Sequence, residues 1–353
     1  MKPLTAVAVS GGIDSLAAAW LLKREGRRVW GIHFTTGYEA EDPSPRIKAI
    51  GRALDIDVTV IDLSAAFRQA VVIPFVRTYL AGRTPNPCLL CNPAIKLGAL
   101  LEVARQRGAD RLATGHYARI ISDDRGRPRL FRGVDRRKDQ SYFLAFLDPE
   151  QLARASFPLG DMTRDGVARL VEEAGLSKYA ARESQDVCFI PKSGYADFVA
   201  REAGVTPSSG PIVDRFGREI GTHPGLHRFT VGQRRGIDCP GPAPYYVIRL
   251  DVARNRLVVG SREDLFSAGC HLSGVRWGVD PPSGPVECRV RLRYRHRAVP
   301  AQLVPRSGGR AEVRFDRPVS AVTPGQGAVG YAGDRVLAAG WIQGGDDGRR
   351  IDH

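Results

Sequence analysis

Two short segments of the sequence combine residue types that can carry out group-transfer chemistry. The first, Ser10-Gly11-Gly12-Ile13-Asp14-Ser15, follows an apolar run and precedes a helical pattern. Its glycines let the backbone approach a ligand closely, and free N–H groups at a helix start attract phosphate. Asp14 can orient Mg²⁺ or a water molecule. No Gly-Lys-Ser/Thr follows, which disfavours γ-phosphate transfer of the kinase type. The segment predicts a nucleotide site.

The second segment holds a C-x-x-C pair, Cys88 and Cys91, between prolines. Asn92 is a suitable N-cap and Pro93 suits the first helical position, so a helix is expected to begin there. Cys91 would then lie just before a helix N-terminus, where the local field lowers the pKa of a thiol. The pair is therefore a candidate for reactive thiolate chemistry.

A third thiol, Cys188, is distant in sequence, so only tertiary structure can bring it to the pair. C-x-x-C pairs serve as zinc ligands, redox dithiols or iron–sulfur ligands. A zinc site would need further ligands, and the sequence has no second C-x-x-C and no His pair at metal spacing. The separate Cys239, Cys270 and Cys288 are expected to be small buried apolar residues.

Alternating short apolar runs and helical patterns must position these segments. Strands are expected at Ala6–Val9, Val29–Phe34, Val58–Leu63 and Arg111–Thr114, and helices at Ser15–Glu25, Pro45–Leu54, Ser64–Leu80 and Pro93–Arg107. This alternation predicts a parallel sheet, whose ligands bind at the carboxyl ends of the strands. His116 follows the last of these strands, which makes it a candidate binding residue.

The pattern of expected strands and helices changes along the rest of the chain. A hairpin is expected at 118–134 and helical structure at 139–175, followed by a small mixed domain with strands at 211–213, 245–250 and 257–259. Further runs at 288–297, 311–315, 327–331 and 335–339 predict a β-barrel. We expect domains at 1–199, 200–272 and 273–353.

The charge balance favours an anionic partner. The formal net charge is +14, and such an excess most often accompanies nucleic-acid binding. Arg occupies every second position of 289–297, so a strand there would present five guanidinium groups on one face. No apolar run approaches the ~18 residues of a membrane span, and neither a signal peptide nor a repeat is recognisable. Six scattered cysteines indicate reduced thiols and a cytoplasmic location.

Beyond these inferences, the first segment resembles the ATP-pyrophosphatase loop, Ser-Gly-Gly-x-Asp-Ser. Nine segments, in order, resemble the tRNA-specific 2-thiouridylases of the MnmA type over nearly the whole chain. They are Ser10–Ser15, Gly82–Pro87, Cys91–Asn92 with Ile95–Lys96, Thr114–Arg119, Lys138–Leu144, Ser184–Ile190, Phe229–Gly236, Pro244–Val247 and Thr323–Gln326. The resemblance implies an α/β N-terminal domain of the adenine-nucleotide-hydrolase type, a small central domain that contacts tRNA, and a C-terminal β-barrel.

The resemblance also implies an activity and a set of site residues. ATP would adenylate O2 of the wobble uridine, position 34 of tRNA; sulfur would arrive as a persulfide on Cys188, and Cys91 would assist its release as AMP leaves. The implied ATP site consists of Ala8, Val9, Ser10, Gly11, Gly12, Ile13, Asp14, Ser15, Phe34 and Gly115. The implied tRNA contacts are Asn86, Pro87 and Cys88 at the target base, with His116, Lys138, Asp139, Gln140, Arg293, Tyr294 and Gln326.

Two departures from the family pattern bear on mechanism. Cys88 stands where the family usually has Asp, and 35–45 lacks the family's acidic, cysteine-containing insert. Cys88, Cys91 and Cys188 together are the donor set of a [4Fe–4S] cluster with one open iron. We favour a cluster-dependent variant of the family. The alternative is the persulfide route, in which two of these thiols can form a disulfide.

The expected cofactors are ATP and Mg²⁺, with a [4Fe–4S] cluster under the first of these routes. The expected partners are tRNA and a sulfur donor, either a persulfide carrier protein or sulfide. We expect no membrane association and a monomer or weak dimer. An amidotransferase-type adenylating enzyme and a non-catalytic RNA-binding protein stay open as other functions.

Overall fold

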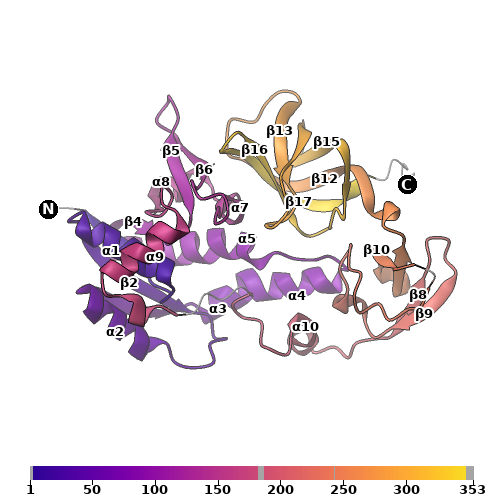
Figure 1. Cartoon of the computed structure of the whole chain (residues 1–353), viewed down its shortest axis with the longest axis horizontal. Helices are drawn as coiled ribbons and strands as arrows, with labels where there is room; N and C mark the ends of the chain where they lie inside the picture. The colour runs from indigo at the N-terminus through magenta and orange to yellow at the C-terminus, as the bar shows by residue number, and fades with distance from the viewer. Residues whose placement is uncertain (1–2, 182–186, 242, 347–353) are drawn as a thin grey trace. The chain divides into compact units, whose positions relative to one another are not determined.

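The computed structural model describes residues 3–181, 187–241 and 243–346 (Figure 1). Ser184–Asp186 of the resemblance segment Ser184–Ile190 therefore lie outside the described residues. The chain divides into two compact units. The first comprises 1–72, 87–189 and 334–336, and the second comprises 73–86, 190–333 and 337–353.

The first unit is built on a five-stranded parallel sheet in the order β3-β2-β1-β4-β7. Its strands are β1 (Leu4–Ala8), β2 (Arg28–Thr35), β3 (Asp57–Asp62), β4 (Ala109–Ala113) and β7 (Ala155–Ser156). Chain order reverses on the two sides of β1, and ligands of open α/β sheets bind at such a point. The predicted α/β class and parallel sheet are confirmed.

The first unit also contains several helices, some of which pack their apolar faces on the sheet. They are α1 (Ile13–Arg24), α2 (Ser44–Leu54), α3 (Ser64–Phe67), α5 (Pro87–Cys91), α6 (Leu100–Gln106), α7 (Ser141–Leu144), α8 (Pro149–Arg154) and α9 (Arg164–Glu173). Leu16, Ile50 and Val167, from α1, α2 and α9, share one core with Val7 of β1. An antiparallel hairpin, β5 (Ala118–Ser122) and β6 (Pro128–Arg132), follows β4.

The helix after the C-x-x-C segment begins earlier than expected. Helical structure runs from Pro87 through a π-helical stretch at Asn92–Ala99 into α6. Pro87 supplies the fixed φ of a helix start, and the wider π-helical turn accommodates Pro93, which has no N–H to donate. Cys91 is therefore inside a helix, and the prediction that it precedes the N-terminus is wrong.

One helical stretch is long and apolar enough to span a membrane by length and composition alone. It is Pro87–Gln106, and half of its most apolar window is buried inside the protein. The expectation from the sequence concerned uninterrupted apolar runs, and this stretch is not one, because Asn92, Lys96 and Glu102 interrupt it. A helix buried in the core of a soluble protein passes the same test of length and composition.

The second unit holds α4 (Ile73–Leu80), α10 (Tyr195–Ala203) and two β structures. Strands β8 (Gly210–Val213), β9 (Glu219–His223), β10 (Tyr246–Asp251) and β11 (Arg256–Gly260) form a four-stranded sheet. Strands β12 (Phe266–Trp277), β13 (Val286–Arg291), β14 (Val299–Arg306), β15 (Arg310–Ser320), β16 (Gly327–Ala332) and β17 (Arg335–Asp346) form the barrel, which closes by pairing of β12 with β17. The predicted barrel is confirmed.

The arginine-rich run differs from its prediction. β13 ends at Arg291, and 292–296 form bends and turns before β14. Arg293, Arg295 and Arg297 are exposed on that connection. The predicted strand face with five guanidinium groups is therefore wrong, because alternation of residue types does not show where a strand ends. Helical structure at 139–175 is also interrupted, by β7.

Candidate functional site

The loop between β1 and α1 is held open by its own hydroxyl groups. Ser15 Oγ donates to the carbonyl of Gly12 at 2.8 Å and accepts from the backbone N–H of Ser10 at 3.2 Å. Gly11 has φ +80, a conformation that favours glycine. Arg46 of α2 donates to the carbonyl of Gly11 at 2.6 Å. The loop is thus preorganised, with the start of α1 facing the sheet's carboxyl edge.

The end of β4 packs directly on this loop. A Cβ on Gly115 would lie 2.6 Å from the carbonyl carbon of Asp14 and 2.9 Å from the backbone nitrogen of Ser15. Only glycine leaves the two backbones this close. His116 follows, buried, with Nδ1 2.7 Å from the hydroxyl of Thr114. The ends of β1 and β4 therefore lie together at the switch point of the sheet, where the chain order of the strands reverses beside β1.

Asp14 is a bound rather than a solvated carboxylate. Its Oδ1 accepts from the Tyr117 hydroxyl at 2.9 Å and lies 3.4 Å from the Arg164 guanidinium of α9. Burial and the nearby Asp14 carboxylate raise the pKa of Tyr117 above its ordinary value, so the phenol stays protonated as a donor. These contacts fix the orientation of Asp14 beside the loop.

A cavity of about 430 Å³, here called the nucleotide cavity, opens over these groups. Its polar lining includes Glu39, whose carboxylate accepts from the Thr36 N–H at 2.7 Å and from the Gly37 N–H at 2.9 Å. The cavity is lined by Ala8, Val9, Ser10, Asp14, Ser15, Ile32, His33, Phe34, Thr36, Glu39, Lys96, Thr114, Gly115, His116, Gln140 and Cys188. Most of the expected ATP-site residues thus lie around one space, and Gly11, Gly12 and Ile13 belong to the loop beside it.

A second cavity, of about 170 Å³, holds the three expected thiols and is here called the thiol cavity. Its walls are largely apolar: Phe34, Thr36, Phe67, Val71, Pro87, Cys88, Cys91, Asn92, Lys96, His116, Gln140, Phe143, Val187, Cys188 and Phe189. Cys91 is buried, Cys88 is half-buried and Cys188 is exposed. Tertiary structure therefore brings Cys188 to the C-x-x-C pair, as the chemistry would require.

The thiols of this cavity are harder to ionise than expected. Burial raises the pKa of Cys91 to about 12, and it raises the pKa of Cys88. Cys188 is exposed as a residue, but its thiol lines the largely apolar cavity, and this desolvation raises its pKa as well. The positive charge of Lys96 opposes this effect at all three. The predicted lowering of the Cys91 pKa is therefore wrong, because Cys91 lies inside a buried helix rather than before its start.

The two cavities share part of their walls. The shared residues are Phe34, Thr36, Lys96, His116, Gln140 and Cys188. Burial, and then the charge of Lys96, lower the pKa of His116 well below its ordinary value, so its imidazole is neutral. A nucleotide bound at the glycine loop and a sulfur carried by these thiols would therefore lie on the two sides of the same group of residues.

Several expected tRNA contacts lie outside both cavities. Asn86, Arg293, Tyr294 and Gln326 belong to the second unit. There the Gln326 amide donates to the carbonyls of Thr84 at 3.0 Å and Pro85 at 3.1 Å. This gives Gln326 a structural role, holding the chain that leads to Asn86.

In the first unit, Asp139 is buried and its carboxylate accepts from the N–H groups of Gly133 and Ser141. Lys138 lies in the same turn, where its N–H donates to the carbonyl of Asp135. Neither Lys138 nor Asp139 lines the nucleotide cavity or the thiol cavity.

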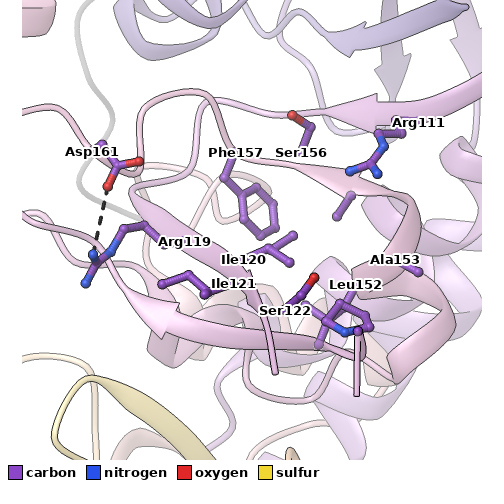
Figure 2. Close-up of a pocket in the computed structure, with 13 residues that line it drawn as sticks. Arg111, Arg119, Ile120, Ile121, Ser122, Leu152, Ala153, Ser156, Phe157 and Asp161 are labelled. Atoms are coloured by element: carbon purple, nitrogen blue, oxygen red, sulfur yellow. Dashed lines mark ion pairs between the residues drawn. The ribbon is translucent and has the colours of Figure 1, made fainter. Parts of the chain in front are cut away.

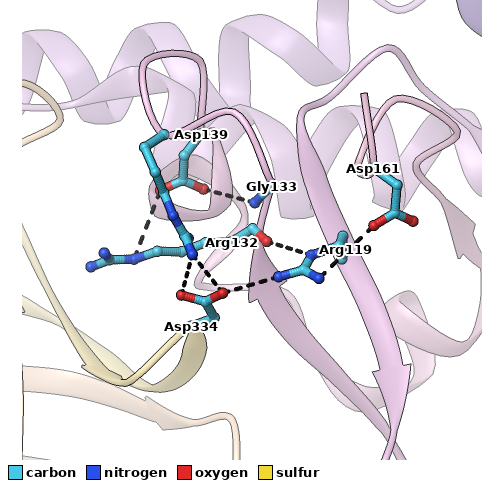
Figure 3. Close-up of polar contacts among 7 residues, drawn as sticks. Arg119, Arg132, Gly133, Asp139, Asp161 and Asp334 are labelled. Atoms are coloured by element: carbon cyan, nitrogen blue, oxygen red, sulfur yellow. Dashed lines mark hydrogen bonds and ion pairs between the residues drawn. The ribbon is translucent and has the colours of Figure 1, made fainter. Parts of the chain in front are cut away.

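Acidic residues surround the arginines near β6 (Figure 3). Asp334 accepts from Arg136 at 2.5 Å and 2.6 Å and from Arg119 at 3.1 Å. Arg132 lies 3.9 Å from Asp139. These contacts compensate much of the positive charge that the sequence suggests here, so less of it is available to bind phosphate.

A third cavity, also about 430 Å³, lies apart from this chemistry (Figure 2). β4, β7, α8 and the β5–β6 hairpin line it, with Arg111, Leu152 and Phe157 among its residues. It contains none of the thiols and none of the loop residues. The hydroxyl and guanidinium groups around it show no arrangement that indicates a particular ligand.

The structure gives roles at the nucleotide loop and the cavities to further residues that were not expected there from the sequence. Tyr117 and Arg164 hold Asp14, Glu39 faces the nucleotide cavity, and Lys96 faces both cavities. Tyr117 and Lys96 stood within segments of family resemblance, which was the only available signal. Nothing in the sequence near Arg164 or Glu39 marked them.

Comparison with protein families matches the chain in three parts. A model described as tRNA methyl transferase HUP domain matches residues 4–192. Models described as tRNA methyl transferase PRC-barrel domain and Aminomethyltransferase beta-barrel domain match residues 196–261 and 267–342. More than half of the chain is thus covered by the first match alone.

Curated relatives match nearly the whole chain and share one name, tRNA-specific 2-thiouridylase MnmA. The relative from Desulfosudis oleivorans is 51% identical and covers 97% of this chain and 95% of its own. Those from Geotalea uraniireducens and Syntrophotalea carbinolica are 44% and 45% identical, covering 96% and 95% of this chain and 94% and 97% of their own. The chain therefore belongs to the family of tRNA-specific 2-thiouridylases.

Proposed function

We propose that the protein catalyses ATP-dependent 2-thiolation of a uridine in tRNA, at the wobble position 34. The observation that carries this proposal is the wall shared by the nucleotide cavity and the thiol cavity. An activated oxygen and a sulfur must approach one carbon atom, and adjoining cavities allow that approach. The curated relatives carry the name of this activity.

In the first step, ATP would adenylate O2 of the uridine and release pyrophosphate. The backbone N–H groups of Ser10–Ser15 and the start of α1 would bind the phosphates, and Phe34 and Gly115 would flank the nucleotide. Mg²⁺, when bound, would neutralise the departing pyrophosphate, and Asp14 is the carboxylate beside the loop. Tyr117 and Arg164 would keep Asp14 oriented during this step.

In the second step, sulfur would attack C2 of the uridine. A C–S bond forms, the C2–O2 bond breaks, and AMP leaves with that oxygen. With hydrosulfide as donor, the S–H proton moves to N3 of the base. With a Cys188 persulfide, Cys91 would attack the inner sulfur and release the outer one to the base, which leaves a Cys91–Cys188 disulfide for a reductant to cleave.

The thiols allow a test of fit for an iron–sulfur cluster. Three cysteines on one cavity are the right donor type and number for a [4Fe–4S] cluster with one open iron. Among the described residues, no group of three His, Cys, Asp or Glu is arranged to hold a single metal ion. From the type and number of these donors, we propose Cys88, Cys91 and Cys188 as the ligands of such a cluster; when bound, it would supply an iron site for hydrosulfide.

The remaining proposals concern partners and organisation. Asn86, Pro87 and Cys88 would meet the target base, and His116, Lys138, Asp139, Gln140, Arg293, Tyr294 and Gln326 would contact tRNA. The sulfur donor would be hydrosulfide or a persulfide carrier protein. We propose catalytic, central and barrel domains at 1–199, 200–272 and 273–353, a cytoplasmic location, and a monomer or weak dimer.

The function can be tested with anaerobically purified protein. Unmodified tRNA, ATP and Mg²⁺ would be supplied with hydrosulfide or, in a second series, with a persulfide donor, and nucleosides digested from the tRNA would be analysed by mass spectrometry. We expect 2-thiouridine that requires ATP and is lost in Cys188→Ser. Methylated uridine, or no product with either sulfur donor, would overturn the proposal.

The same preparation decides the sulfur route. Iron and acid-labile sulfide would be measured in the wild type and in Cys88→Ser, with Cys239→Ser as a control cysteine outside both cavities. We expect iron in the wild type and the control and its loss in Cys88→Ser. Iron-free protein that is fully active as wild type and as Cys88→Ser would contradict the cluster and leave the persulfide route.

A further inference from the structure

Lys96 occupies an unusual position in the wall shared by the two cavities. It is the only lysine or arginine among the described residues that line either cavity. Its side chain is partly buried. A positive charge in that setting lies between the space for the nucleotide phosphates and the space for sulfur.

The local helix geometry places Lys96 on the side of the thiols. Asn92–Ala99 is π-helical, with hydrogen bonds between residues five apart. Cys91 and Lys96 are five apart, so the wider turn brings both toward one side, and both line the thiol cavity. In a regular α-helix, a residue five positions on would point well away from the first.

Lys96 has no counter-charge within the described part of the chain. It makes neither a hydrogen bond nor an ion pair there. The two carboxylates that line the nucleotide cavity have other partners: Glu39 accepts from the N–H groups of Thr36 and Gly37, and Asp14 accepts from the Tyr117 hydroxyl and pairs with Arg164. His116, in the same wall, is neutral. A partly desolvated ammonium without a partner is costly, so an anionic ligand is the expected partner.

The proposed reaction supplies two anions at this wall in succession. Before transfer, the nucleophilic sulfur carries the negative charge. After transfer, the phosphate of AMP has gained it, because the C2–O2 bond breaks toward that oxygen. A fixed positive charge between the two positions favours this movement of charge and needs no reorganisation.

We propose that the Lys96 ammonium is a catalytic group that contacts the α-phosphate of the adenylated tRNA and stabilises the charge this phosphate gains as sulfur displaces AMP. This inference rests on the proposed function and adds a residue to its second step. It assigns Lys96 to the departure of AMP, not to the binding of ATP. The charge of Lys96 also opposes the rise in pKa of the thiols in the thiol cavity, so it favours anionic sulfur there.

The test separates the two steps. Wild type, Lys96→Met, Lys96→Gln and Lys96→Arg would be compared anaerobically with ATP, Mg²⁺, hydrosulfide and tRNA. Lys48→Met is the matched control, because Lys48 is exposed on α2 and lines neither cavity. Pyrophosphate release without a sulfur donor would report adenylation, and 2-thiouridine under single-turnover conditions would report transfer.

We expect Lys96→Met and Lys96→Gln to slow transfer by about 10²–10³-fold, the usual effect of removing one fixed charge-stabilising donor. Adenylation and the affinity for tRNA should stay within about threefold of the wild type. Lys96→Arg, which keeps the charge, should recover part of the transfer rate, and Lys48→Met should retain all of it. Thermal melts would identify any variant that is not folded, in which case the Lys96→Arg and Lys96→Gln rates decide.

Two results would overturn the inference. Transfer in Lys96→Met within threefold of the wild type would show that the charge is not used. An equal loss of adenylation and transfer would assign Lys96 to ATP binding instead. If the wild type itself made no 2-thiouridine, the proposed function would fail, which is a separate outcome from either of these.

Discussion

Gly115→Ala has a definite steric consequence at the nucleotide loop. The new Cβ would lie 2.6 Å from the carbonyl carbon and 2.7 Å from the carbonyl oxygen of Asp14, and 2.9 Å from the nitrogen of Ser15. Ordinary contact begins at 3.4 Å, so the two backbones must separate by about 0.8 Å. All three atoms are backbone, so no side-chain rotation relieves the contact.

The expected cost has two parts. Overpacking of this kind destabilises by about 1–3 kcal/mol, which corresponds to a fall in melting temperature of about 2–10 °C. Displacing the phosphate-binding loop by nearly 1 Å should lower the adenylation rate by about 10²-fold, since misplacement on that scale has such effects. The stability loss is therefore moderate, and the activity loss is large.

Calorimetry and pyrophosphate release would measure these two effects. Gly284→Ala is the matched control, because a Cβ there meets nothing within 4 Å and Gly284 lies outside the site. We expect the control to match the wild type in both assays. If Gly115→Ala adenylated tRNA at the wild-type rate, the close packing of β4 on the loop would not be required, and the reasoning about the switch point would be refuted.

Three further predictions concern stability. Burial lowers the pKa of His116 in the folded protein, so the unfolded state takes up a proton first as the pH falls below about 6.5, and folding stability is lost there. In urea melts, His116→Gln should reduce this loss of stability at acid pH. An unchanged dependence of stability on pH would contradict the burial argument. Burial raises the pKa of Cys270 from 9.0 to about 12, so stability should fall from pH 9 upward by at most about 1.4 kcal/mol per pH unit; Cys270→Ala should lack this component, and an identical alkaline slope would count against it. Asp334→Asn should cost about 1 kcal/mol, and less at high salt, because its arginine pairs are partly exposed; a salt-independent loss would show that packing, not charge, is affected.

The sequence predicted the parallel sheet and the barrel well, because both leave regular signals. Alternating apolar runs and helical patterns located every strand of the nucleotide fold except β7, which has only two residues. Period-2 patterns located four of the barrel strands at least in part, but they could not show where β13 ends. Exposed Arg293 and Arg295 continue the alternation of the strand into a turn.

The chemistry of Cys91 shows a different limit of sequence reasoning. Asn92 and Pro93 are a strong helix-start signal, and they led to an expected low thiol pKa. Tertiary packing instead continues the helix back to Pro87 and buries Cys91. Tertiary burial thus outweighed local helix propensity, and the pKa of the Cys91 thiol is raised instead of lowered.

Local sequence patterns could not predict which distant segments of the chain lie close together in the fold. Cys188 meets the C-x-x-C pair only through the fold, although the family resemblance had implied that meeting. Lys96 needed the π-helical stretch, which a helical pattern does not distinguish from an α-helix. Both cases depend on which residues face one cavity, a property of packing rather than of sequence period.

The most direct test of the account follows AMP and 2-thiouridine together. Protein and tRNA would first be incubated with ATP labelled at the α-phosphate, without a sulfur donor, and hydrosulfide would then be added in a single turnover. We expect that label first attaches to tRNA, and that each equivalent of AMP released on addition of hydrosulfide is matched by one equivalent of 2-thiouridine. Release of AMP without 2-thiouridine, or 2-thiouridine without prior labelling of tRNA, would contradict it.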